Sequence, residues 1–411
     1  MKPATIRFID KYLGAAACAC FSGLYRVQRA IGLAPIPPTG TVPERILFLK
    51  LVEQGATVLA SGALLRAIDL VGRENVHFCC FAENRAIVDI MDLIPPENVL
   101  TIRTTRFTIT VWDILRVAWR ARRLKVDATI DLEFFAKSSA VLAYLCGAQR
   151  RVGMDRFTAE GPYRGQLMTH RVQYSPYLHT AIAYALLLEA VLRDPEEVPL
   201  CKELPEDYAM TPLQRRPSDD MLTNLRERLE AVLPAGINRI VLLNPNPTDS
   251  LFVRKWPEQR FVSLGREILE RHTDTALVFV GTPEEREDTE RLCTEIASER
   301  VVTMAGRTTL RELIGLFWIA DVLVTNDSGP AHFATLSPIH IVAMYGPETP
   351  VLFGPLGTRV QIVHYHLSCS PCLNVFNHRV SPCRDNVCIQ RITVDEVGAA
   401  VDGALAERAA G

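Results

Sequence analysis

Short runs of consecutive apolar residues alternate with longer stretches of helical periodicity along most of this chain. The first apolar run is Ile46–Leu49, the helical stretch Val58–Val71 follows it, and Val76–Phe81 is the next run. Strands that alternate with helices are typical of a parallel sheet with helices on both faces. A charged, proline-rich segment at residues 194–220 interrupts the pattern, which then begins again. We therefore predict an α/β protein with two Rossmann-like, doubly wound domains of similar size that face a cleft.

The same patterns place the other elements and the domain bounds. Further strands are predicted at Ala128–Asp131, Arg239–Leu243, Ala276–Val280, Val322–Thr325 and Ile339–Tyr345. Further helices are predicted at Arg85–Met91, Trp112–Arg123, Ser138–Leu145, Ala181–Leu192, Arg260–Arg271, Glu284–Ile296 and Leu310–Ile319. We expect an N-terminal helix in residues 1–40, the first domain at 41–193, a linker at 194–220, the second domain at 221–392 and a C-terminal helix at 393–411.

Composition excludes several classes of protein. The chain has 411 residues, of which 48% are hydrophobic and 22% are charged, which is typical of a globular protein. The formal net charge of -2 gives no overall attraction to nucleic acid, so no nucleic-acid partner is expected. Because no run of about 18 apolar residues lacks a charge or a breaker, a spanning helix is not expected.

The N-terminal segment has a helical apolar pattern with basic residues between. The apolar positions are Ile6, Ile9, Leu13, Ala17, Cys20, Phe21, Leu24, Val27 and Ile31. A basic amphipathic helix can lie on a membrane surface or pack against its own protein, and the pattern leaves both open. A secretory signal is less favoured because no clear small-x-small cleavage site precedes a polar start.

The turn Asn326–His332 follows the apolar run Val322–Thr325 and opens a helix at Pro330. Proline suits the first helical position, and Asp327 or Ser328 is expected to cap the free amides. A turn of this kind directs backbone N–H groups and the positive end of a helix toward a bound anion. An ordinary strand-to-helix turn is the alternative, and His332 could equally be a core histidine or a ligand contact.

Two other predicted strand ends in the second domain carry polar residues. Thr248, Asp249 and Ser250 form a polar loop before Arg254 and Lys255, and hydroxyls with two cations suit a phosphate. After the next strand comes Gly281–Glu285, where an acid could bind ribose hydroxyls or only cap a helix. For Thr248, Asp249 and Ser250, with the two cations that follow, the alternative is an ordinary solvated loop.

The first domain offers an acid in the loop after its opening strand. Glu53 is the only acid between Lys50 and Thr57, and Gly55 in the same loop would let a ligand approach the backbone. Glu53 could act as a general base toward an acceptor hydroxyl, or it could be a solvated helix N-terminal acid. Asp131 and Glu133, with Lys137 shortly after, form a second candidate patch.

From Arg45 to Val397 the chain resembles glycosyltransferase family 9, the ADP-heptose:lipopolysaccharide heptosyltransferases. The residues that carry the resemblance are Gly147–Gly153, Arg254–Phe261 with its Trp-Pro pair, Ala305–Leu313, Asn326–His332 and Tyr345–Pro347. The resemblance implies a GT-B fold with the nucleotide-sugar donor in the C-terminal domain. It also implies inverting transfer without a catalytic metal or other catalytic cofactor.

Carried over by position, the resemblance assigns donor-binding roles. Arg254 stands where the family's phosphate-binding lysine usually lies, with Lys255 beside it. Thr248 and Ser250 would lie in the phosphate loop, Glu284 would bind ribose, and Thr308 would lie near the base. The remaining donor-pocket residues are Asp327, Ser328, Gly329 and His332.

One position departs from the family pattern. Typical members carry Gly-Asp in the first-domain loop, and that aspartate is the presumed general base, whereas this chain has Gly55-Ala56. Loss of a general base costs about 10²–10⁴-fold in rate. We expect Glu53, one helical turn away, to replace it. Gly55, Asp131 and Lys137 are assigned to the acceptor side.

Four of the eleven cysteines are clustered, at Cys369, Cys372, Cys383 and Cys388. A Cys-x-x-Cys pair followed by two thiols can hold a structural zinc or iron ion, and free or disulfide-linked thiols are the alternative. Four thiolates would leave no open position for catalysis. The flanking histidines His364, His366 and His378 are alternative ligands.

Three functions remain open at the level of sequence. The leading one is transfer of a sugar from an ADP-heptose-like donor to a lipopolysaccharide-core or other glycolipid acceptor. The family resemblance implies that the sugar is heptose. It also implies a cytoplasmic enzyme that contacts the inner membrane peripherally. A catalytically silent nucleotide-sugar-binding scaffold is favoured by Ala56. A sugar-nucleotide epimerase or hydrolase would turn over donor with no acceptor present.

Overall fold

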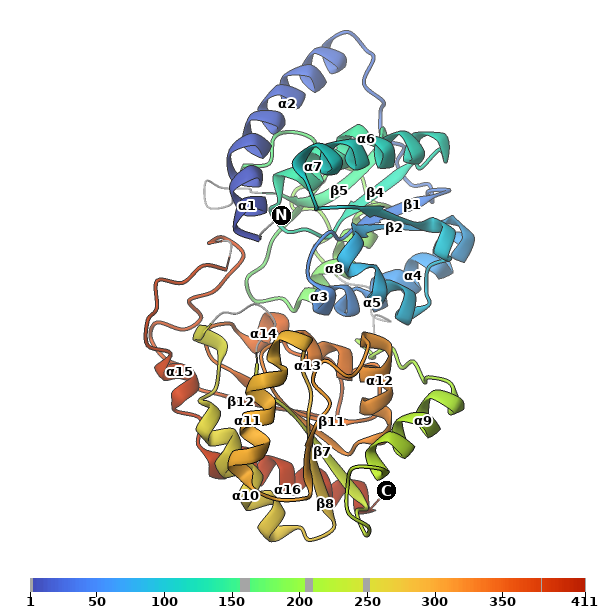
Figure 1. Cartoon of the computed structure of the whole chain (residues 1–411). Helices are drawn as coiled ribbons and strands as arrows, with labels where there is room; N and C mark the ends of the chain where they lie inside the picture. Colours follow the sequence, from blue (N-terminus) through green and yellow to red (C-terminus); the bar gives the residue numbers. More distant parts are fainter. Residues whose placement is uncertain (1–2, 156–162, 204–209, 247–251, 378, 411) are drawn as a thin grey trace. The chain divides into compact units, whose positions relative to one another are not determined.

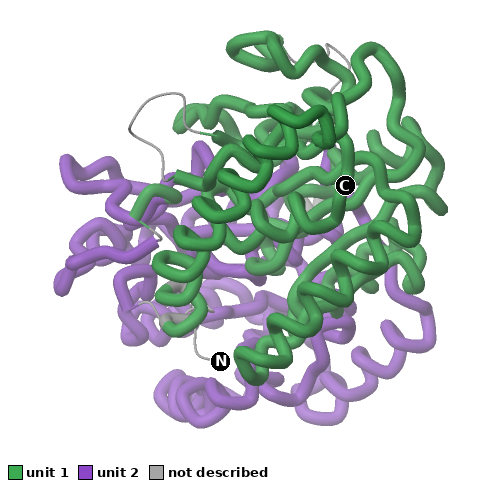
Figure 2. The backbone as a smooth tube through the Cα atoms, turned by 90° about the horizontal axis from the view of Figure 1, so that it is seen from above, with its two compact units in different colours: residues 1–210, 375–378 green, residues 211–374, 379–411 purple. Residues whose placement is uncertain are grey.

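The computed structural model describes residues 1–411 except 1–2, 156–162, 204–209, 247–251, 378 and 411. The chain divides into two compact units (Figure 2). Unit 1 comprises residues 1–210 and 375–378, and unit 2 comprises residues 211–374 and 379–411. Each unit is built on one six-stranded parallel sheet, which confirms the predicted α/β class (Figure 1).

The sheet of unit 1 has the strand order β3-β2-β1-β4-β5-β6. Its strands are β1 Ile46–Leu49, β2 Val76–Phe81, β3 Val99–Ile102, β4 Ala128–Asp131, β5 Arg150–Asp155 and β6 His170–Gln173. The four inner strands β1, β2, β4 and β5 are almost entirely buried because helices cover both faces, which explains the continuous apolar run of β1 and the mostly apolar sequence of β2.

The helices of unit 1 form two layers. On one face, α6 packs against α7 and α2 lies against α7; on the other, α4 packs against α8 and α3 against α5 (Figure 1). The bounds are α1 Pro3–Ile9, α2 Ala15–Ala30, α3 Gln54–Leu59, α4 Ser61–Val71, α5 Arg85–Met91, α6 Phe107–Arg123, α7 Lys137–Leu145 and α8 Thr180–Ala190.

The sheet of unit 2 has the order β12-β11-β10-β7-β8-β9. Its strands are β7 Arg239–Asn244, β8 Thr275–Phe279, β9 Val301–Thr303, β10 Val322–Asn326, β11 His340–Tyr345 and β12 Val360–His364. Its helices are α9 Asp219–Glu230, α10 Glu258–Arg271, α11 Arg286–Ile296, α12 Leu310–Ile319, α13 Gly329–Ala334, α14 Pro350–Phe353, α15 Val387–Gln390 and α16 Val394–Ala410. The core under α10 contains Trp256 and Phe261, whose rings meet edge to face with centroids 4.9 Å apart.

Both sheets have the same topology. In each unit the chain builds three strands outward from the middle, returns to the middle, and builds three strands the other way. The return lies between β1 and β4 in unit 1, and between β7 and β10 in unit 2. Open α/β sheets bind ligands at this topological switch point, at the carboxyl ends of the strands. The candidate sites are therefore expected at these two switch points.

The predicted elements differ from the structure in several places. The stretch Val58–Val71 is two helices, α3 and α4, which meet at Ala60. Helix α6 begins at Phe107, five residues before the predicted start, and the first residues of the predicted helix at 284–296 form the 3₁₀ turn Pro283–Glu285. The strands β3, β5, β6, β9 and β12 were not predicted. All five lie outside the central pairs of their sheets, and their short or polar sequences carry a weak strand signal.

The expected N-terminal helix is present, but the π-helical turn Asp10–Gly14 divides it into α1 and α2. The carboxylate of Asp10 accepts bonds from the backbone N–H groups of Lys137 and Ser138 at the start of α7. Helix α2 buries Cys18, Ser22 and Tyr25, and it leaves the apolar side chains of Leu24, Val27 and Ile31 exposed. No helix in the described part of the chain is long and apolar enough to cross a bilayer.

Candidate functional site

The turn after β10 is buried and is held by side chains of neighbouring strands. The hydroxyl of Ser328 lies 3.2 Å from that of Thr325, and the amide of Asn244 donates to Thr325 at 3.2 Å. No side chain caps α13, so the expectation that Asp327 or Ser328 would cap it is wrong. The Ser328 hydroxyl is instead directed toward β7 and β10, where Asn244 and Thr325 bind it.

Asn326 fixes the loop after β7 against this turn. Its Oδ1 accepts a hydrogen bond from the backbone N–H of Trp256 at 2.9 Å, and its Nδ2 donates to the carbonyl of Pro245 at 2.8 Å. Trp256 is fully buried, and its indole N–H donates to the carbonyl of Ile392. Strand β7, its loop and strand β10 therefore form one rigid edge at the switch point of unit 2.

Arg254 lies on this edge with two carboxylates. Its Nη2 donates to Glu348 Oε2 at 2.7 Å, and its Nε lies 3.5 Å from Asp327 Oδ2. Arg379 Nε lies 3.7 Å from the same Glu348 oxygen. The side chains of Arg254, Asp327 and Glu348 are each less than 10% exposed, so the cluster is desolvated. Two guanidinium groups and two carboxylates thus meet at this edge.

Tyr345 lies next to the cluster at the end of β11. Its hydroxyl donates to the carbonyl of Phe353 at 2.8 Å. Burial, together with the nearby Asp327 carboxylate, raises the pKa of this phenol far above its usual value. Tyr345 is therefore neutral, and it positions the loop that carries Glu348.

Lys255 has a different environment from its neighbour. Its ammonium group pairs with Glu258 in the first turn of α10. Burial acts to raise the pKa of Glu258, but its hydrogen bonds to Lys255 and Arg291 outweigh burial and hold that pKa below its usual range. Of the two adjacent cations, the structure brings Arg254 alone onto the Asp327 turn.

Glu284 and Thr308 lie on adjoining loops at the carboxyl ends of β8 and β9. Glu284 is exposed on the 3₁₀ turn Pro283–Glu285, where the neighbouring Glu285, not Glu284, closes the capping box with Thr282. The backbone N–H of Gly306 donates to the carbonyl of Gly281 at 3.0 Å. Gly306 has φ +63°, and a Cβ there would lie 2.6 Å from Pro283 Cα. The glycine therefore allows these two loops to touch.

The other donor-side predictions divide into two groups. Gly329 is the first residue of α13, and His332 is buried within the same helix. Thr248 and Ser250, with Asp249, lie outside the described residues. Strand ends thus gather Arg254, Asp327, Ser328, Gly329 and His332 at β7 and β10, while Glu284 and Thr308 lie further along the same edge.

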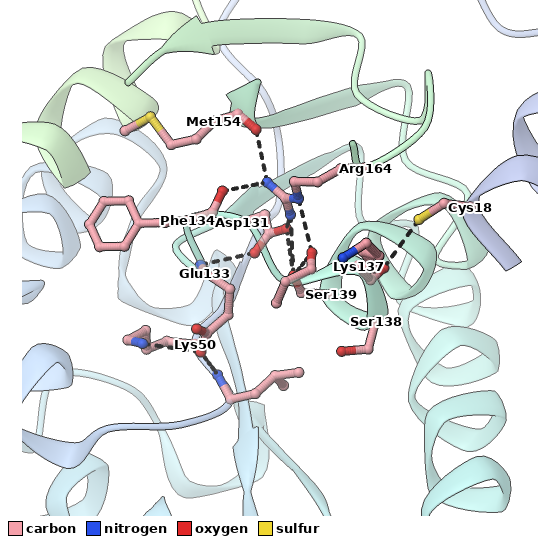
Figure 3. Close-up of polar contacts among 12 residues, drawn as sticks. Cys18, Lys50, Asp131, Glu133, Phe134, Lys137, Ser138, Ser139, Met154 and Arg164 are labelled. Carbon is pink, nitrogen blue, oxygen red and sulfur yellow. Dashed lines mark hydrogen bonds and ion pairs between the residues drawn. The ribbon is translucent and has the colours of Figure 1, made fainter. Parts of the chain in front are cut away.

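Lys50, at the end of β1, is the centre of the switch point of unit 1. Its ammonium group lies 3.1 Å from Glu133 Oε1 and 3.3 Å from Glu53 Oε2 (Figure 3 shows the pair with Glu133). Burial acts to lower the pKa of Lys50, but Glu133, Tyr184 and Glu53 together outweigh it and the net pKa is raised. Lys50 is therefore a buried, permanently charged cation.

Glu53 occupies a strained position directly before α3. Its φ of 69° is in the left-handed region, which non-glycine residues seldom adopt. Such a residue costs on the order of 1–3 kcal/mol, and strain of this size is concentrated at functional sites. The Glu53 side chain is 34% exposed, in contrast to the buried Ala56 in the first turn of α3. Gly55 is buried beside Ala56.

Asp131 belongs to a second, fully buried network. It pairs with Arg164 and accepts hydrogen bonds from Ser139 Oγ at 2.8 Å and from the backbone N–H of Glu133 at 3.0 Å (Figure 3). Burial raises the pKa of Asp131 to about 6, against the opposing effect of Arg164. Arg164 also donates to the carbonyls of Phe134, Ala136 and Met154. The Asp131–Arg164 pair therefore joins the loop after β4 and strand β5 to the segment that carries Arg164.

Glu133 connects the two networks of unit 1. Besides Lys50, its Oε1 accepts the backbone N–H groups of Leu51 and Val52 at 2.7 and 3.0 Å. It thereby fixes the loop that carries Glu53. Lys137 is buried at the start of α7, where its backbone N–H donates to Asp10 and its carbonyl accepts from the Cys18 thiol.

Cys369, Cys372 and Cys383 lie between β12 and α15, Cys388 lies in α15, and all four are free thiols. Burial raises the pKa of Cys388, and Cys372 and Cys383 raise it further. Cys369 is exposed. Among the residues that the structure describes, no group of three or more His, Cys, Asp or Glu side chains has an arrangement that could hold a metal ion.

The sequence did not single out several members of these clusters. Lys50 and Glu348 each follow an apolar strand within three residues, and a charge in that position was a signal that could have found them. Arg164 and Arg379 lie in loops far from their partners in sequence, and no local pattern identifies them.

The two sheets and their polar switch points define a protein with two Rossmann-like α/β units, the class in which nucleotide-binding enzymes are common. The profile of glycosyltransferase family 9 (heptosyltransferase) matches residues 114–379. The chain belongs to this family.

Curated relatives resemble part of the chain. Lipooligosaccharide heptosyltransferase 2 of Campylobacter jejuni is 26% identical over 166 residues, which cover 39% of this chain and 49% of the relative. The match thus spans about half the length of that relative. A Haemophilus influenzae protein of the same name is 30% identical over 112 residues, 27% of this chain and 32% of its own.

Solved structures resemble nearly the whole chain in fold. The Escherichia coli ADP-heptose lps heptosyltransferase II has a TM-score of 0.68 at 16% identity, covering 89% of this chain and 99% of its own. The iron-containing dodecameric glycosyltransferase TibC of enterotoxigenic E. coli has a TM-score of 0.50 at 12% identity, covering 90% and 78%. These likenesses confirm the expected GT-B class of fold.

Proposed function

We propose that this protein transfers a heptose from a nucleotide-diphosphate donor to a hydroxyl of a lipopolysaccharide-core or related glycolipid acceptor, with inversion at the anomeric carbon. Membership of glycosyltransferase family 9 supports the reaction type. The names of its relatives support heptose as the sugar and ADP as the nucleotide. The single observation that carries the proposal for the site is the rigid polar edge at the switch point of unit 2, where Arg254 and the Asp327 turn lie side by side.

In this proposal unit 2 holds the donor. The diphosphate approaches Arg254 and takes the place of one of its carboxylate partners, because a guanidinium fork binds phosphate oxygens as well as it binds carboxylates. Glu284 and Thr308, on adjoining loops, accept the ribose and base. As the bond to the anomeric carbon breaks, negative charge grows on the diphosphate, and the guanidinium stabilises it.

Unit 1 supplies the base. Glu53 takes the proton of the acceptor hydroxyl, which attacks the anomeric carbon from the face opposite the leaving diphosphate. The ammonium group of the buried Lys50 holds the Glu53 carboxylate in place and pairs with Glu133 as well. The strained backbone at Glu53 sets the direction of its side chain.

Replacement of Glu53 by glutamine tests this assignment. We expect Glu53→Gln to lower kcat by about 10²–10⁴-fold, since glutamine cannot take a proton, and to leave ADP binding unchanged. The matched control is Glu83→Gln, an acid at the end of the neighbouring strand β2. Undiminished transfer by Glu53→Gln would reject Glu53 as the base.

A silent nucleotide-sugar-binding scaffold is the second candidate, and Ala56 in place of the usual aspartate favours it. It predicts ADP-heptose binding with no transfer to any lipopolysaccharide-core acceptor. Consumption of ADP-heptose without an acceptor would instead indicate an epimerase or hydrolase.

We also propose that the clustered cysteines hold a structural zinc or iron ion. The four thiols fall within twenty residues of sequence, and a movement of the exposed Cys369 and its neighbours would bring them into a tetrathiolate set. The ion would order residues 369–388 and take no part in transfer. Elemental analysis should find about one zinc or iron per chain, lost in Cys372→Ser. Metal-free protein of unchanged thermal stability would contradict the proposal.

A further inference from the structure

Helix α6 of unit 1 has a second apolar face that no part of the described chain covers. Its inner face packs against β3 and α7 through Val117, Ala118 and Ala121. The outer face carries a stripe of large apolar side chains at helical spacing: Phe107, Val111, Trp112, Leu115 and Trp119, all of them exposed. Trp112 is 66% exposed and Trp119 is 57% exposed. Two exposed tryptophans on one helix are unusual, because tryptophan rings are usually buried in protein cores or interfaces.

The charges on α6 are arranged around this stripe and are almost all positive. The helix has four arginines, at 116, 120, 122 and 123, and one acid, Asp113. Asp113 is fully buried and is bound by Arg103 through two hydrogen bonds of 2.8 and 2.9 Å. Arg116, Arg120 and Arg122 each donate to a backbone carbonyl of a neighbouring segment. With four arginines and one acid, the helix as a whole carries positive charge. The guanidinium of Arg123 lies over the ring of Trp119, 4.9 Å from its centroid.

The apolar surface continues from α6 onto α1. A crevice of about 90 Å³ lies between the two helices, and its lining includes Ile6, Ile9, Phe107, Val111 and Ile114. Phe8 of α1 is 63% exposed. The bond between Asp10 and the start of α7 holds α1 in this position.

We propose that the outer face of α6, with α1 beside it, docks on the surface of an anionic lipid bilayer. Tryptophan and phenylalanine favour the boundary between headgroups and acyl chains, and the arginines around them match negatively charged headgroups. An uncharged apolar partner would not account for the positive charge of the helix or for Arg123 over Trp119. Since α6 is too short and too charged to cross a bilayer, it lies in the plane of the surface. The docking surface is independent of the transfer reaction proposed above.

Vesicle binding of the full chain tests the proposal. Vesicles of phosphatidylcholine mixed with phosphatidylglycerol should sediment the protein, and vesicles of phosphatidylcholine alone should bind it much less. Trp112→Ser/Trp119→Ser should abolish binding. Arg106 directly precedes the first residue of α6, and Arg123 is its last residue. Arg106→Gln/Arg123→Gln should weaken vesicle binding, by about fivefold for each arginine removed, and should reduce its dependence on salt. Tyr177→Ser is the matched control, since Tyr177 is an exposed aromatic of unit 1 outside α6.

Brominated lipids give a second readout that does not depend on a loss of binding. The chain has four tryptophans; of the other two, Trp256 is fully buried and Trp318 lies in α12 of unit 2. Lipid bromine should quench the fluorescence of the wild type, and it should quench Trp112→Phe/Trp119→Phe much less although that variant still binds.

Several results would overturn the proposal. These are a wild type that does not bind anionic vesicles, binding that survives Trp112→Ser/Trp119→Ser, and binding lost instead in Leu24→Ser/Val27→Ser, which would place the contact on α2. Dimers in solution that Trp112→Ser/Trp119→Ser dissolves, without any vesicle binding, would show that a second copy of the chain covers this face.

Discussion

At the scale of single residues, the most constrained group in unit 1 is the ammonium of Lys50. It is 1% exposed, and two carboxylates lie within 3.3 Å of it. A buried ion pair seldom adds net stability over an apolar replacement, but removal of one partner leaves an uncompensated charge. The pair therefore keeps the Glu53 loop in one geometry, which is its value to a catalytic site.

Lys50→Met should destabilise unit 1 by about 3–5 kcal/mol, because Glu133 and Glu53 lose their cation. The double variant Lys50→Met/Glu133→Gln should be more stable than the sum of the single changes predicts. Chemical denaturation measures both. Arg73→Met is the control, since its pair with Asp92 is exposed and should contribute at most about 1 kcal/mol. Additive effects of the two changes would contradict this account.

Sequence reasoning identified part of these clusters for physical reasons. Arg254, Asp327 and Glu53 follow apolar strands in the chain, and strand ends of a parallel sheet meet at one edge. Arg164 and Arg379 could not be found in this way. Each reaches its carboxylate from a loop, and the path of a loop depends on the tertiary fold.

At the scale of elements, the strands in the middle of each sheet were predicted and the outer ones were missed. Central strands such as β1 and β10 are buried on both faces, so their sequences are continuous apolar runs. Edge strand β12 is half-exposed, and β5 begins with two arginines, so neither has that signal. The break between α3 and α4 was missed because the apolar periodicity continues through Ala60.

Gly306→Ala tests whether the Glu284 and Thr308 loops depend on close backbone contact. The new Cβ would clash with Pro283 in addition to the strain of its positive φ. Gly236→Ala is the matched control, because Gly236 also has a positive φ but has no atom within 4 Å of the added Cβ. We expect Gly236→Ala to lower the free energy of unfolding by about 1 kcal/mol and Gly306→Ala to lower it by more. Gly306→Ala should also bind ADP more weakly. Equal losses in the two variants, measured by denaturation, would show that the contact is unimportant.

At the scale of the whole molecule, two sheets with the same strand order occur in one chain. The repeated sequence rhythm predicted two doubly wound domains, and the structure confirms two parallel α/β units. The apolar stripe on the N-terminal segment allowed two interpretations. The structure shows that α2 packs on α7 through Cys18 and Tyr25 and that much of the stripe stays exposed.

Acid should unfold the protein partly through His77 of β2. Burial, followed by the nearby Arg45 and Arg120, lowers the pKa of His77 to about 4, from 6.5 in the unfolded chain. Between pH 6.5 and 4 the unfolded state binds a proton that the folded state does not, so stability is lost as the pH falls through this window. His77→Leu should reduce that loss, and the exposed His366→Leu should not. A pH dependence of unfolding that His77→Leu leaves unchanged would contradict this assignment.

The most direct test of the central claim is the affinity of ADP for the full chain, measured by titration calorimetry in three proteins. The account predicts that Arg254→Lys, which keeps the charge but loses the guanidinium fork, weakens binding by about tenfold or more, whereas Lys255→Met changes it little. Equal affinity in the wild type and Arg254→Lys, or a loss confined to Lys255→Met, would contradict the placement of the diphosphate at the Asp327 turn.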